Sequence, residues 1–345
     1  MEPTLSITEL RETLAPYREK NNALALALLA GDIALLAIGQ WLVLASHPLA
    51  GKGLGALITW VAIVRLFVIG HDACHGALTS SERLNRILGR IAFLPSLTPF
   101  SLWRVGHNVV HHGFNNLRGR DFVWEPMNPQ EYAAKPAWRR AVERIYRGAL
   151  GPALYYFVEI WWKRLYFPAK AFISARRGQF LADSLLVSVA GSVWIAALVV
   201  AARSMGAPVE AILVCGFVVP FILWNWTVGL IVYLHHTNPD LRWFDDRREW
   251  LAVSAQLNST AHLIMPWPIG PLMHHIMEHP AHHLDAFIPL YHLKAAQRRL
   301  QALGVIATET RFTLRHYLAC VRQCKVYDYA RRCWAPFPVV QPSAA

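Results

Sequence analysis

Long apolar runs alternate with polar segments along the chain, and four of these runs are long enough to cross a lipid bilayer. A spanning helix needs about 20 predominantly apolar residues. The candidate spans lie approximately at residues 23–46, 53–70, 184–202 and 211–234. The pattern therefore predicts two hairpins of spanning helices, separated by a long and mostly polar middle section.

Three residues interrupt the apolar runs. Asp32 lies inside the first span and Arg65 inside the second, which is also the shortest. Ionisable groups within spans normally face other helices, so we expect Asp32 and Arg65 to interact. Pro220 lacks a backbone N–H and should kink the fourth span.

Composition supports a membrane protein. Of the 345 residues, 54% are hydrophobic and 16% are charged, whereas soluble domains contain about 25% charged residues. The net charge of +12 is best explained by membrane topology, since basic residues gather on cytoplasmic loops. We do not expect nucleic-acid binding.

Lys and Arg are distributed very unevenly. The stretch 71–183 has sixteen, the part after residue 236 has twelve and the first twenty residues have three, whereas the short linkers 47–52 and 203–210 have one each. The positive-inside rule then predicts that both termini and the middle section are cytoplasmic. We expect the protein in a bacterial inner (cytoplasmic) membrane.

The predicted fold is therefore an all-α integral membrane protein with four transmembrane helices under a helical cytoplasmic cap. We expect an amphipathic segment at residues 1–22, a membrane domain at 23–300 and a basic cytoplasmic tail at 301–345. The cap comprises 71–183 and 235–300. Ser6 and Glu9 have capping-box spacing, which predicts a short helix on the membrane surface, with a frayed terminus as the alternative.

Most of the sixteen histidines fall into clusters. The clusters are "HDACH" (71–75), "HNVVHH" (107–112), "HH" (235–236) and "HHIMEHPAHH" (274–283). Two of them begin where spans are predicted to emerge on the same side of the membrane. His47, His262, His292 and His316 stand apart, and we expect no ligand role for them.

The spacing within the clusters points to metal binding. On a helix, residues four apart share one face, so His71/His75, His107/His111 and His279/His283 can each present two imidazoles to one side. Imidazole is the commonest metal ligand. About ten histidines exceed the four ligands of a structural zinc site and match two metal ions. Because imidazole suits Zn, Cu, Fe and Ni, ligand type alone leaves the metal open.

These motifs resemble those of the membrane fatty acid desaturase family, most closely bacterial acyl-lipid desaturases. "HDACH", "HNVVHH" and "HPAHH" have the forms of the three histidine boxes of that family. "LHHTNP" (234–239) and "IPLYHLKAA" (288–296) resemble segments that accompany the boxes, and the similarity covers about residues 20–300.

The resemblance implies a non-haem diiron centre that uses O2 to place a double bond in a membrane lipid acyl chain. Its two iron ions would be held by His71, His75, His107, His111, His112, His236, His275, His279, His282 and His283. One departure is Pro280. Since the residue before a proline disfavours helical geometry, we expect the helix to begin at Pro280 with His279 as its cap.

The family chemistry also requires supporting residues. Ligand histidines need partners on their other ring nitrogen, and the expected partners or neighbours are Asp72, Asp121, Glu125, His235, His274 and Asp285. For each of the four acids, a solvated surface carboxylate is the alternative. An acyl chain needs an apolar tunnel, for which Trp103, Trp224 and Trp226 are candidates. The aromatic stretch 154–167 suits a tunnel wall or, with slightly better support, a membrane-interface belt.

Electrons must come from outside, because the sequence has no dinucleotide fingerprint or fused cytochrome element. A ferredoxin-like acidic donor would be steered to the basic cytoplasmic face. The same scaffold can support a hydroxylase or ketolase acting on a carotenoid, a sphingolipid or another lipid. A metal transporter or a membrane cytochrome would place its ligands near the middle of the spans, where this sequence has no histidine.

Overall fold

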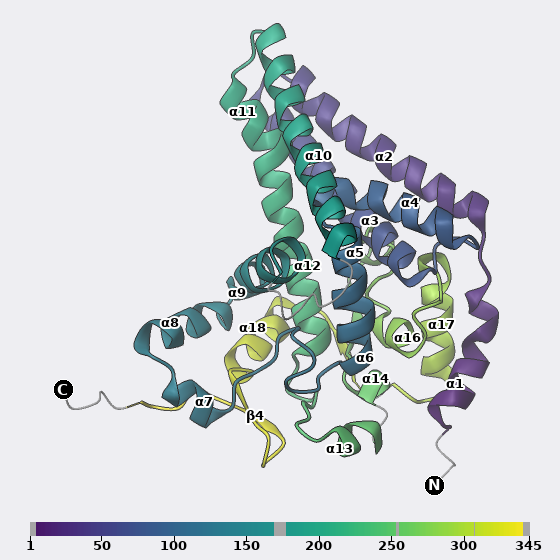
Figure 1. Ribbon diagram of the computed structural model, residues 1–345, viewed down its shortest axis with the longest axis vertical. Helices are drawn as coiled ribbons and strands as arrows, with labels where there is room; N and C mark the ends of the chain where they lie inside the picture. The colour runs from purple at the N-terminus through teal and green to yellow at the C-terminus, as the bar shows by residue number, and fades with distance from the viewer. Residues whose placement is uncertain (1–4, 169–176, 253–254, 307, 341–345) are drawn as a thin grey trace.

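Figure 1 shows the protein as a computed structural model, in which four long helices rise from a broad helical body. The structure describes residues 5–168, 177–252, 255–306 and 308–340. Parts of the expected segments, namely residues 1–4, 169–176, 253–254, 307 and 341–345, lie outside the described residues. The architecture confirms an all-α membrane fold.

The four candidate membrane spans are Asn22–Ala45, Leu49–His75, Gly178–Ser204 and Val209–His236. The first is helix α2 (Asn22–Ala45), the second is α3 (Leu49–His75), and the third lies within α10 (Arg177–Ser204). Helix α3 is longer at both ends than the predicted range 53–70. Its extra turns matter because they include His71 and His75.

The fourth span combines α11 (Val209–Leu213), a π segment η6 (Val214–Val218) and α12 (Val219–His236). The π segment ends just before Pro220, which lies in the first turn of α12. A proline cannot donate the hydrogen bond that a continuing α-helix needs, and π turns relieve such interruptions. The π segment is thus a departure from α-helical hydrogen bonding next to Pro220, and the kink itself stays a prediction.

The buried ionisable residues of the first two spans do interact. The carboxylate of Asp32 is 2% exposed and accepts hydrogen bonds from Arg65 Nε and from His274 Nε2, the latter at 2.6 Å. Arg65 also donates to the carbonyl oxygens of Pro271 and Leu272. This network ties α2 and α3 to a loop that precedes the third histidine box.

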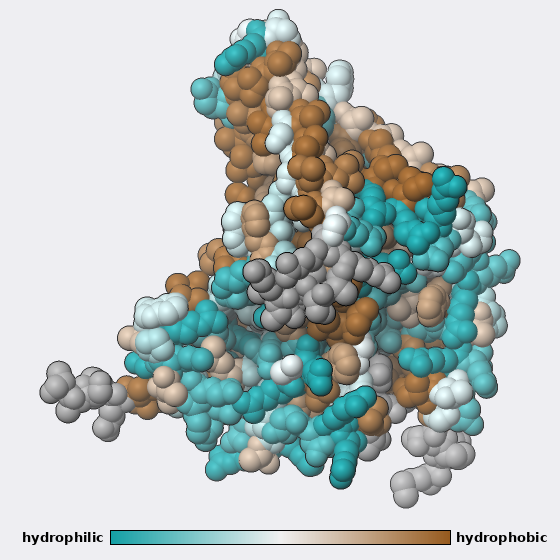
Figure 2. Space-filling view, viewed as in Figure 1, coloured by the Kyte–Doolittle hydropathy of each residue, from teal (hydrophilic) through white to brown (hydrophobic). Residues whose placement is uncertain are grey.

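Hydropathy divides the molecule into two parts. Figure 2 shows hydrophobic residues along the upper arm, which contains α10 and α11, and mostly hydrophilic residues over the lower body. The body contains the remaining helical segments, which are α1 (Ile7–Leu14), η1 (Ala15–Arg18), α4 (Glu82–Phe93), η2 (Leu94–Ser96), α5 (Phe100–Trp103), η3 (Arg104–His111), α6 (His112–Phe114), α7 (Pro129–Ala134), α8 (Ala137–Tyr146), α9 (Gly151–Tyr155), η4 (Tyr156–Tyr166), α13 (Arg247–Ala252), α14 (Ala255–Asn258), α15 (Ile269–Leu272), α16 (His279–Leu284), α17 (Leu290–Ala302) and α18 (Leu314–Gln323).

Two small sheets complete the body. Strand β1 (His262–Ile264) pairs in parallel with β2 (Glu309–Arg311), and His262 lies opposite Glu309. Strand β3 (Val326–Asp328) pairs antiparallel with β4 (Cys333–Ala335). The second pair packs Tyr327 and Trp334 near the buried Trp243. Much of the predicted tail 301–345 is thus folded onto the body.

The N-terminal helix differs in location from the prediction. Helix α1 begins with the expected capping box between Ser6 and Glu9. Its apolar residues Leu10 and Leu14 are buried in the main core rather than lying on a membrane surface. Arg11 donates to the carbonyl of Leu284, so the apolar face of α1 packs against the protein beside the third histidine box.

Candidate metal centre

The second histidine box lies on a π-helix, and this geometry corrects the predicted pairing. We expected His107 and His111 to share a face, as residues four apart do on an α-helix. Segment η3 is instead π-helical, with backbone bonds spanning five residues. Residues five apart therefore align, and the Nε2 atoms of His107 and His112 lie 3.1 Å apart. His111 points to a different group.

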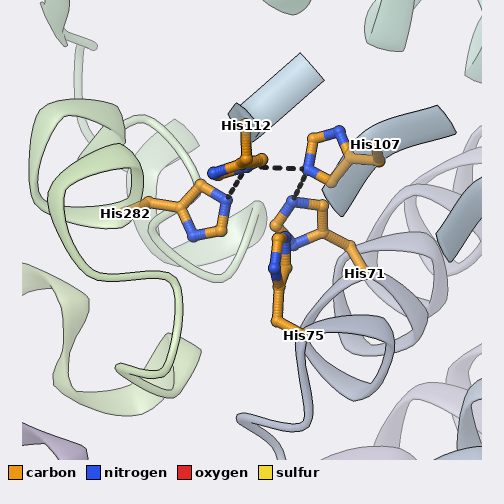
Figure 3. Close-up of side chains that lie close together, drawn as sticks. All are labelled: His71, His75, His107, His112 and His282. Atoms are coloured by element: carbon orange, nitrogen blue, oxygen red, sulfur yellow. Dashed lines mark hydrogen bonds between the residues drawn. The ribbon is translucent and has the colours of Figure 1, made fainter. Parts of the chain in front are cut away.

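One group of imidazoles joins all three boxes. Figure 3 shows its rings converging from α3, from the second box and from α16. His71 Nε2 lies 2.8 Å from His107 Nε2, and His282 Nε2 lies 3.0 Å from His112 Nε2. The members of this group, called site A below, are His71, His75, His107, His112 and His282.

A second group lies beside the first and is entirely buried. His111 Nε2 is 3.1 Å from His236 Nε2, which is 3.0 Å from His279 Nε2. The members of this group, called site B below, are His111, His236, His279 and His283. The rings of His112 and His283 stack with centroids 4.1 Å apart, so the two sites adjoin.

The third box divides between the two sites because of a short helix. Helix α16 begins at His279, its N-cap is Glu278, and Pro280 lies in its first turn. The expectation that His279 caps a helix starting at Pro280 is therefore wrong by one residue. A proline fits the first turn, where its N–H is not needed. His279 and His283 then share one face at site B, while His282 projects to site A.

The donor atoms fit metal ions. Nitrogens bound to one ion at about 2.1 Å and at right angles lie about 3 Å apart, close to the separations of 2.8–3.1 Å found here. Nε2 of His75 and both ring nitrogens of His283 have no hydrogen-bond partner among the described residues. Convergent, buried nitrogen lone pairs without donors are best satisfied by cations.

Electrostatics favour the neutral form that a metal ligand requires. Burial, followed by the proximity of the other imidazoles, holds the pKa of His107 and His112 well below the usual value. The same two causes lower the pKa of His279, His282 and His283. These imidazoles therefore remain unprotonated at neutral pH.

Asp121 contacts the second ring nitrogen of a ligand candidate, whereas Asp72 only approaches one. Both carboxylate oxygens of Asp121 lie 3.1 Å from His111 Nδ1, and they also accept from the backbone N–H groups of Asn116 and Val123. An Asp72 oxygen lies 3.5 Å from His71 Nδ1. A carboxylate hydrogen-bonded to Nδ1, as Asp121 is, aims the opposite nitrogen at a metal. Asp72 makes no such hydrogen bond to His71, and its other oxygen accepts from the backbone N–H of Leu290.

Two other predicted carboxylate partners have different contacts. Glu125 accepts from the backbone of Gly119, and Asp285 pairs with Arg18. Neither carboxylate contacts a ligand candidate in the described part of the chain. Their proximity in sequence to the boxes does not bring them to the histidine rings.

Three histidines of the last two clusters lie outside both sites. His235 stacks on His279 with centroids 3.9 Å apart, so it supports a ligand candidate through its ring face. His274 binds Asp32, and both His274 and His275 have positive φ angles. His275 lies near Glu278, with its Nδ1 3.8 Å from a carboxylate oxygen. The backbone turn thus directs His275, a predicted ligand, away from the two groups.

Sequence reasoning missed the role of His262. Its Nε2 lies 2.6 Å from Glu278 and its Nδ1 lies 2.9 Å from Glu309. Burial alone lowers the pKa of His262, but the two carboxylates outweigh it and raise the pKa overall. Those partners lie 16 and 47 residues away, so local spacing offers no signal.

Two apolar cavities border the sites. They have volumes of about 40 and 50 Å³, and Trp103, His107, Val232 and His279 line both of them. Trp103 also stacks on His107, with ring centroids 4.9 Å apart. The aromatic stretch 154–167 supplies Tyr156, Ile160 and Leu165 to the smaller cavity, so this stretch does form part of a cavity wall.

The other two candidate tunnel residues lie farther from the cavities. Trp224 is fully buried and packs against Phe67 and Tyr156, which line them. Trp226 is 36% exposed and lines neither cavity. On α12, a shift of two residues turns a side chain to the opposite side of the helix, which explains the different environments.

Comparison with known proteins gives concordant results. The sequence profile described as "Fatty acid desaturase" matches residues 46–306. An sn-1 oleoyl-lipid 12-desaturase of Picosynechococcus sp. is 31% identical over 313 residues, covering 88% of this chain and 83% of the relative. Another, of Synechocystis sp., is 29% identical over 276 residues, covering 79% and 76%. A chloroplastic omega-6 fatty acid desaturase of Arabidopsis thaliana is 30% identical over 291 residues, covering 82% of this chain and 61% of the relative.

The profile match includes every histidine of sites A and B, together with three of the four long apolar helices. The buried imidazoles provide the metal-binding capacity that such an enzyme requires. The chain therefore belongs to the fatty acid desaturase family, a family of oxidoreductases.

Proposed function

We propose that this protein is an O2-dependent acyl-lipid desaturase that introduces a double bond at position 12 of an oleoyl chain in a membrane glycerolipid. The observation that supports this most directly is the pair of adjacent imidazole groups beside apolar cavities. The names of the two cyanobacterial relatives support the position of the bond and the sn-1 oleoyl substrate.

Two iron ions are the proposed cofactor, one held by the five histidines of site A and one by the four of site B. Zinc prefers four ligands in structural sites, whereas nine imidazoles in two adjoining groups favour a dinuclear centre. Iron supplies the dioxygen and one-electron chemistry when bound. Desaturation removes two hydrogens from adjacent methylenes, and two electrons and two protons from outside complete the reduction of O2 to two waters.

The chain itself binds and orients the substrate. Apolar walls hold a methylene segment next to the histidines and limit access of water, which favours the intended reaction over side reactions. Trp103 forms a shared wall of both cavities and contacts His107, so it can fix the position of the acyl chain relative to site A. Asp121 keeps His111 in one tautomer and orientation.

The remaining features of the proposal concern location and partners. We place the enzyme in a bacterial cytoplasmic membrane with both termini on the cytoplasmic side, on the basis of the Lys and Arg distribution. Residues 23–300 would form the catalytic membrane domain. An external ferredoxin-like donor would deliver electrons to the basic face, because an acidic protein is attracted to it.

The decisive experiment is expression in a bacterial host together with a plant-type ferredoxin and its reductase, with oleate supplied. Mass spectrometry of the lipids should then locate new double bonds at position 12. The matched control is His111→Ala, which removes one ligand candidate and should abolish the product.

The alternative on the same scaffold is a lipid hydroxylase, which the comparisons do not favour. Growth under labelled O2 separates the two reactions. A new diene without the label supports desaturation, whereas a labelled hydroxyl group on an intact acyl chain would contradict the proposal.

A further inference from the structure

A third cavity lies apart from the apolar pair and has a different chemical character. It has a volume of about 330 Å³ and lies between the loop 264–278 and helix α17. Its lining mixes ionisable groups with an exposed aromatic ring. The residues that matter here are His275, Glu278, Lys294, Arg298, Gln301 and Trp267.

Contacts place one rim of this cavity at the depth of the membrane spans. Pro271 lines the cavity, and its carbonyl accepts from Arg65 within α3. His274, next to the cavity residue His275, binds Asp32 within α2. Arg65 precedes the end of α3 at His75 by ten residues, or about 15 Å of helix. The loop 264–278 therefore contacts α2 and α3 at a depth within the two spans rather than only at their ends.

The surface of this loop is suited to a lipid interface. Trp267 is 87% exposed and Leu272 is 41% exposed, although both are large apolar residues. Trp is enriched where proteins meet the headgroup region of a bilayer, because its ring is apolar and its N–H is polar. Exposed apolar residues beside spanning helices thus make contact with lipid favourable.

The charge in the cavity suits an anion. Lys294 and Arg298 lie on the exposed face of α17, one turn apart, and neither has an ion-pair partner in the part of the chain that the structure describes. The one carboxylate in the lining, Glu278, is already bound to His262. Glu278 and the neighbouring Glu309 both bind His262, whereas Lys294 and Arg298 have no carboxylate partner among the described residues, so the positive charge of the cavity is concentrated at α17.

We propose that this cavity binds the phosphate of an anionic glycerolipid, with Lys294 and Arg298 holding the phosphate and Trp267 and Leu272 contacting the lipid at the bilayer surface. Phosphate is recognised by Arg through paired N–H groups and by Lys as a point charge. A recessed cavity at bilayer depth admits a headgroup, whereas an acidic electron-transfer protein would need a broad, projecting basic surface. This inference goes beyond the proposed function, because it concerns lipid binding in the resting protein.

The test measures lipid binding without turnover. The full-length, metal-loaded protein is purified in detergent, and native mass spectrometry compares retention of phosphatidylglycerol with that of phosphatidylcholine. The wild type should prefer phosphatidylglycerol. The double variant Lys294→Gln/Arg298→Gln should bind it at least about tenfold more weakly, since charge-assisted hydrogen bonds are lost. Metal content and the circular dichroism spectrum show that the variant is folded.

A matched control makes the same change of charge elsewhere. Arg247 and Arg322 are exposed and have no ion-pair partner among the described residues, and neither lines the cavity. Arg247→Gln/Arg322→Gln should keep the preference for phosphatidylglycerol. An equal loss in both double variants would show a general effect of net charge and would overturn the proposal.

Two further arms identify the source of the phosphate. Inorganic phosphate at millimolar concentration should displace little phosphatidylglycerol, and Trp267→Ala should weaken lipid retention, because the lipid also contacts the loop. Full displacement by inorganic phosphate, with no effect of Trp267→Ala, would indicate a site for a free phosphate and reject the lipid. Unchanged lipid binding in Lys294→Gln/Arg298→Gln, with a raised KM for the ferredoxin, would assign these cations to a protein partner instead.

Discussion

Sites A and B adjoin each other, but they differ in how the fold builds them. Site A has five imidazoles, of which His107 and His112 are only partly buried. Site B has four, and all are buried. In site B, Asp121 contacts His111, and its carboxylate is fixed by two backbone N–H groups. Among the described residues, the carboxylate nearest to a site A ring is that of Asp72, with an oxygen 3.5 Å from His71 Nδ1.

This difference has a physical consequence. A site with five donors retains four when one is removed, which is still a common coordination number. A site with four donors retains three, and the described residues offer it no further donor. Site B should therefore be the more fragile of the two, and its geometry should depend more on the residues that surround it.

Loss of a ligand should give the largest effect and the sharpest test of the comparison. In His236→Ala, site B retains three histidines, so we expect iron content to fall from two to about one per chain. In His75→Ala, site A retains four, so more iron should remain. Each of these two substitutions should lower activity by more than 10–100-fold, which is the loss typical when a hydrogen-bond partner of a metal ligand is removed. Metal analysis of the purified variants measures the iron content per chain. Equal iron content in His236→Ala and His75→Ala would refute the proposed greater fragility of site B.

Changes to the supporting carboxylates should have the next largest effect. Asp121→Asn weakens the acceptor at His111 Nδ1 and should lower activity or iron affinity by about 10–100-fold. Asp72→Asn should cost less, because that oxygen lies farther from His71. Iron titration and turnover rates compare the two variants. A larger loss in Asp72→Asn would reverse the proposed ranking.

A smaller effect is expected at His262, which contacts Glu278, the N-cap residue of α16, and whose role sequence reasoning missed. His262→Gln removes the cation between Glu278 and Glu309 and should lower the free energy of unfolding by about 1–3 kcal/mol, discounted because Glu309 is partly exposed. Thermal unfolding measures it, and His316→Gln, at a half-exposed histidine, is the control. An unchanged melting temperature would show that the bridge does not stabilise the fold.

The sign of the pH dependence follows from the raised pKa of His262. The folded state binds the proton more tightly than the unfolded state, so the stabilisation is complete below the ordinary histidine value of about 6.5. It is lost as pH rises through the higher folded pKa. The stability difference between wild type and His262→Gln should therefore narrow as pH rises above neutrality.

The smallest effect is expected at a residue that contacts neither site. Trp226 is 36% exposed and lines neither apolar cavity, so Trp226→Leu should leave activity within about twofold and iron content unchanged, as for most surface substitutions. Product analysis checks this. A shift in the position of the double bond would show that Trp226 contacts the acyl chain after all.

Sequence patterns predicted a large part of this protein, because they are local. Apolar length predicts the four long helices, since a helix that crosses a bilayer must satisfy its own backbone and present apolar side chains. The interaction of Asp32 with Arg65 follows from the cost of an unpaired charge there. The histidine boxes follow from residue type and spacing, and their resemblance to a known family identified it correctly.

The tertiary structure alone decided which histidine belongs to which site. The π-helix at the second box separates His107 from His111, and the start of α16 divides the third box between the two sites. The π-helix and the start of α16 each depend on which backbone hydrogen bonds form when the helices pack together. The turn that directs His275 away and the carboxylates that meet at His262 likewise depend on contacts between distant segments. Sequence determined the elements and the donor chemistry, whereas packing determined the grouping, because convergence of side chains in space is a property of the folded chain.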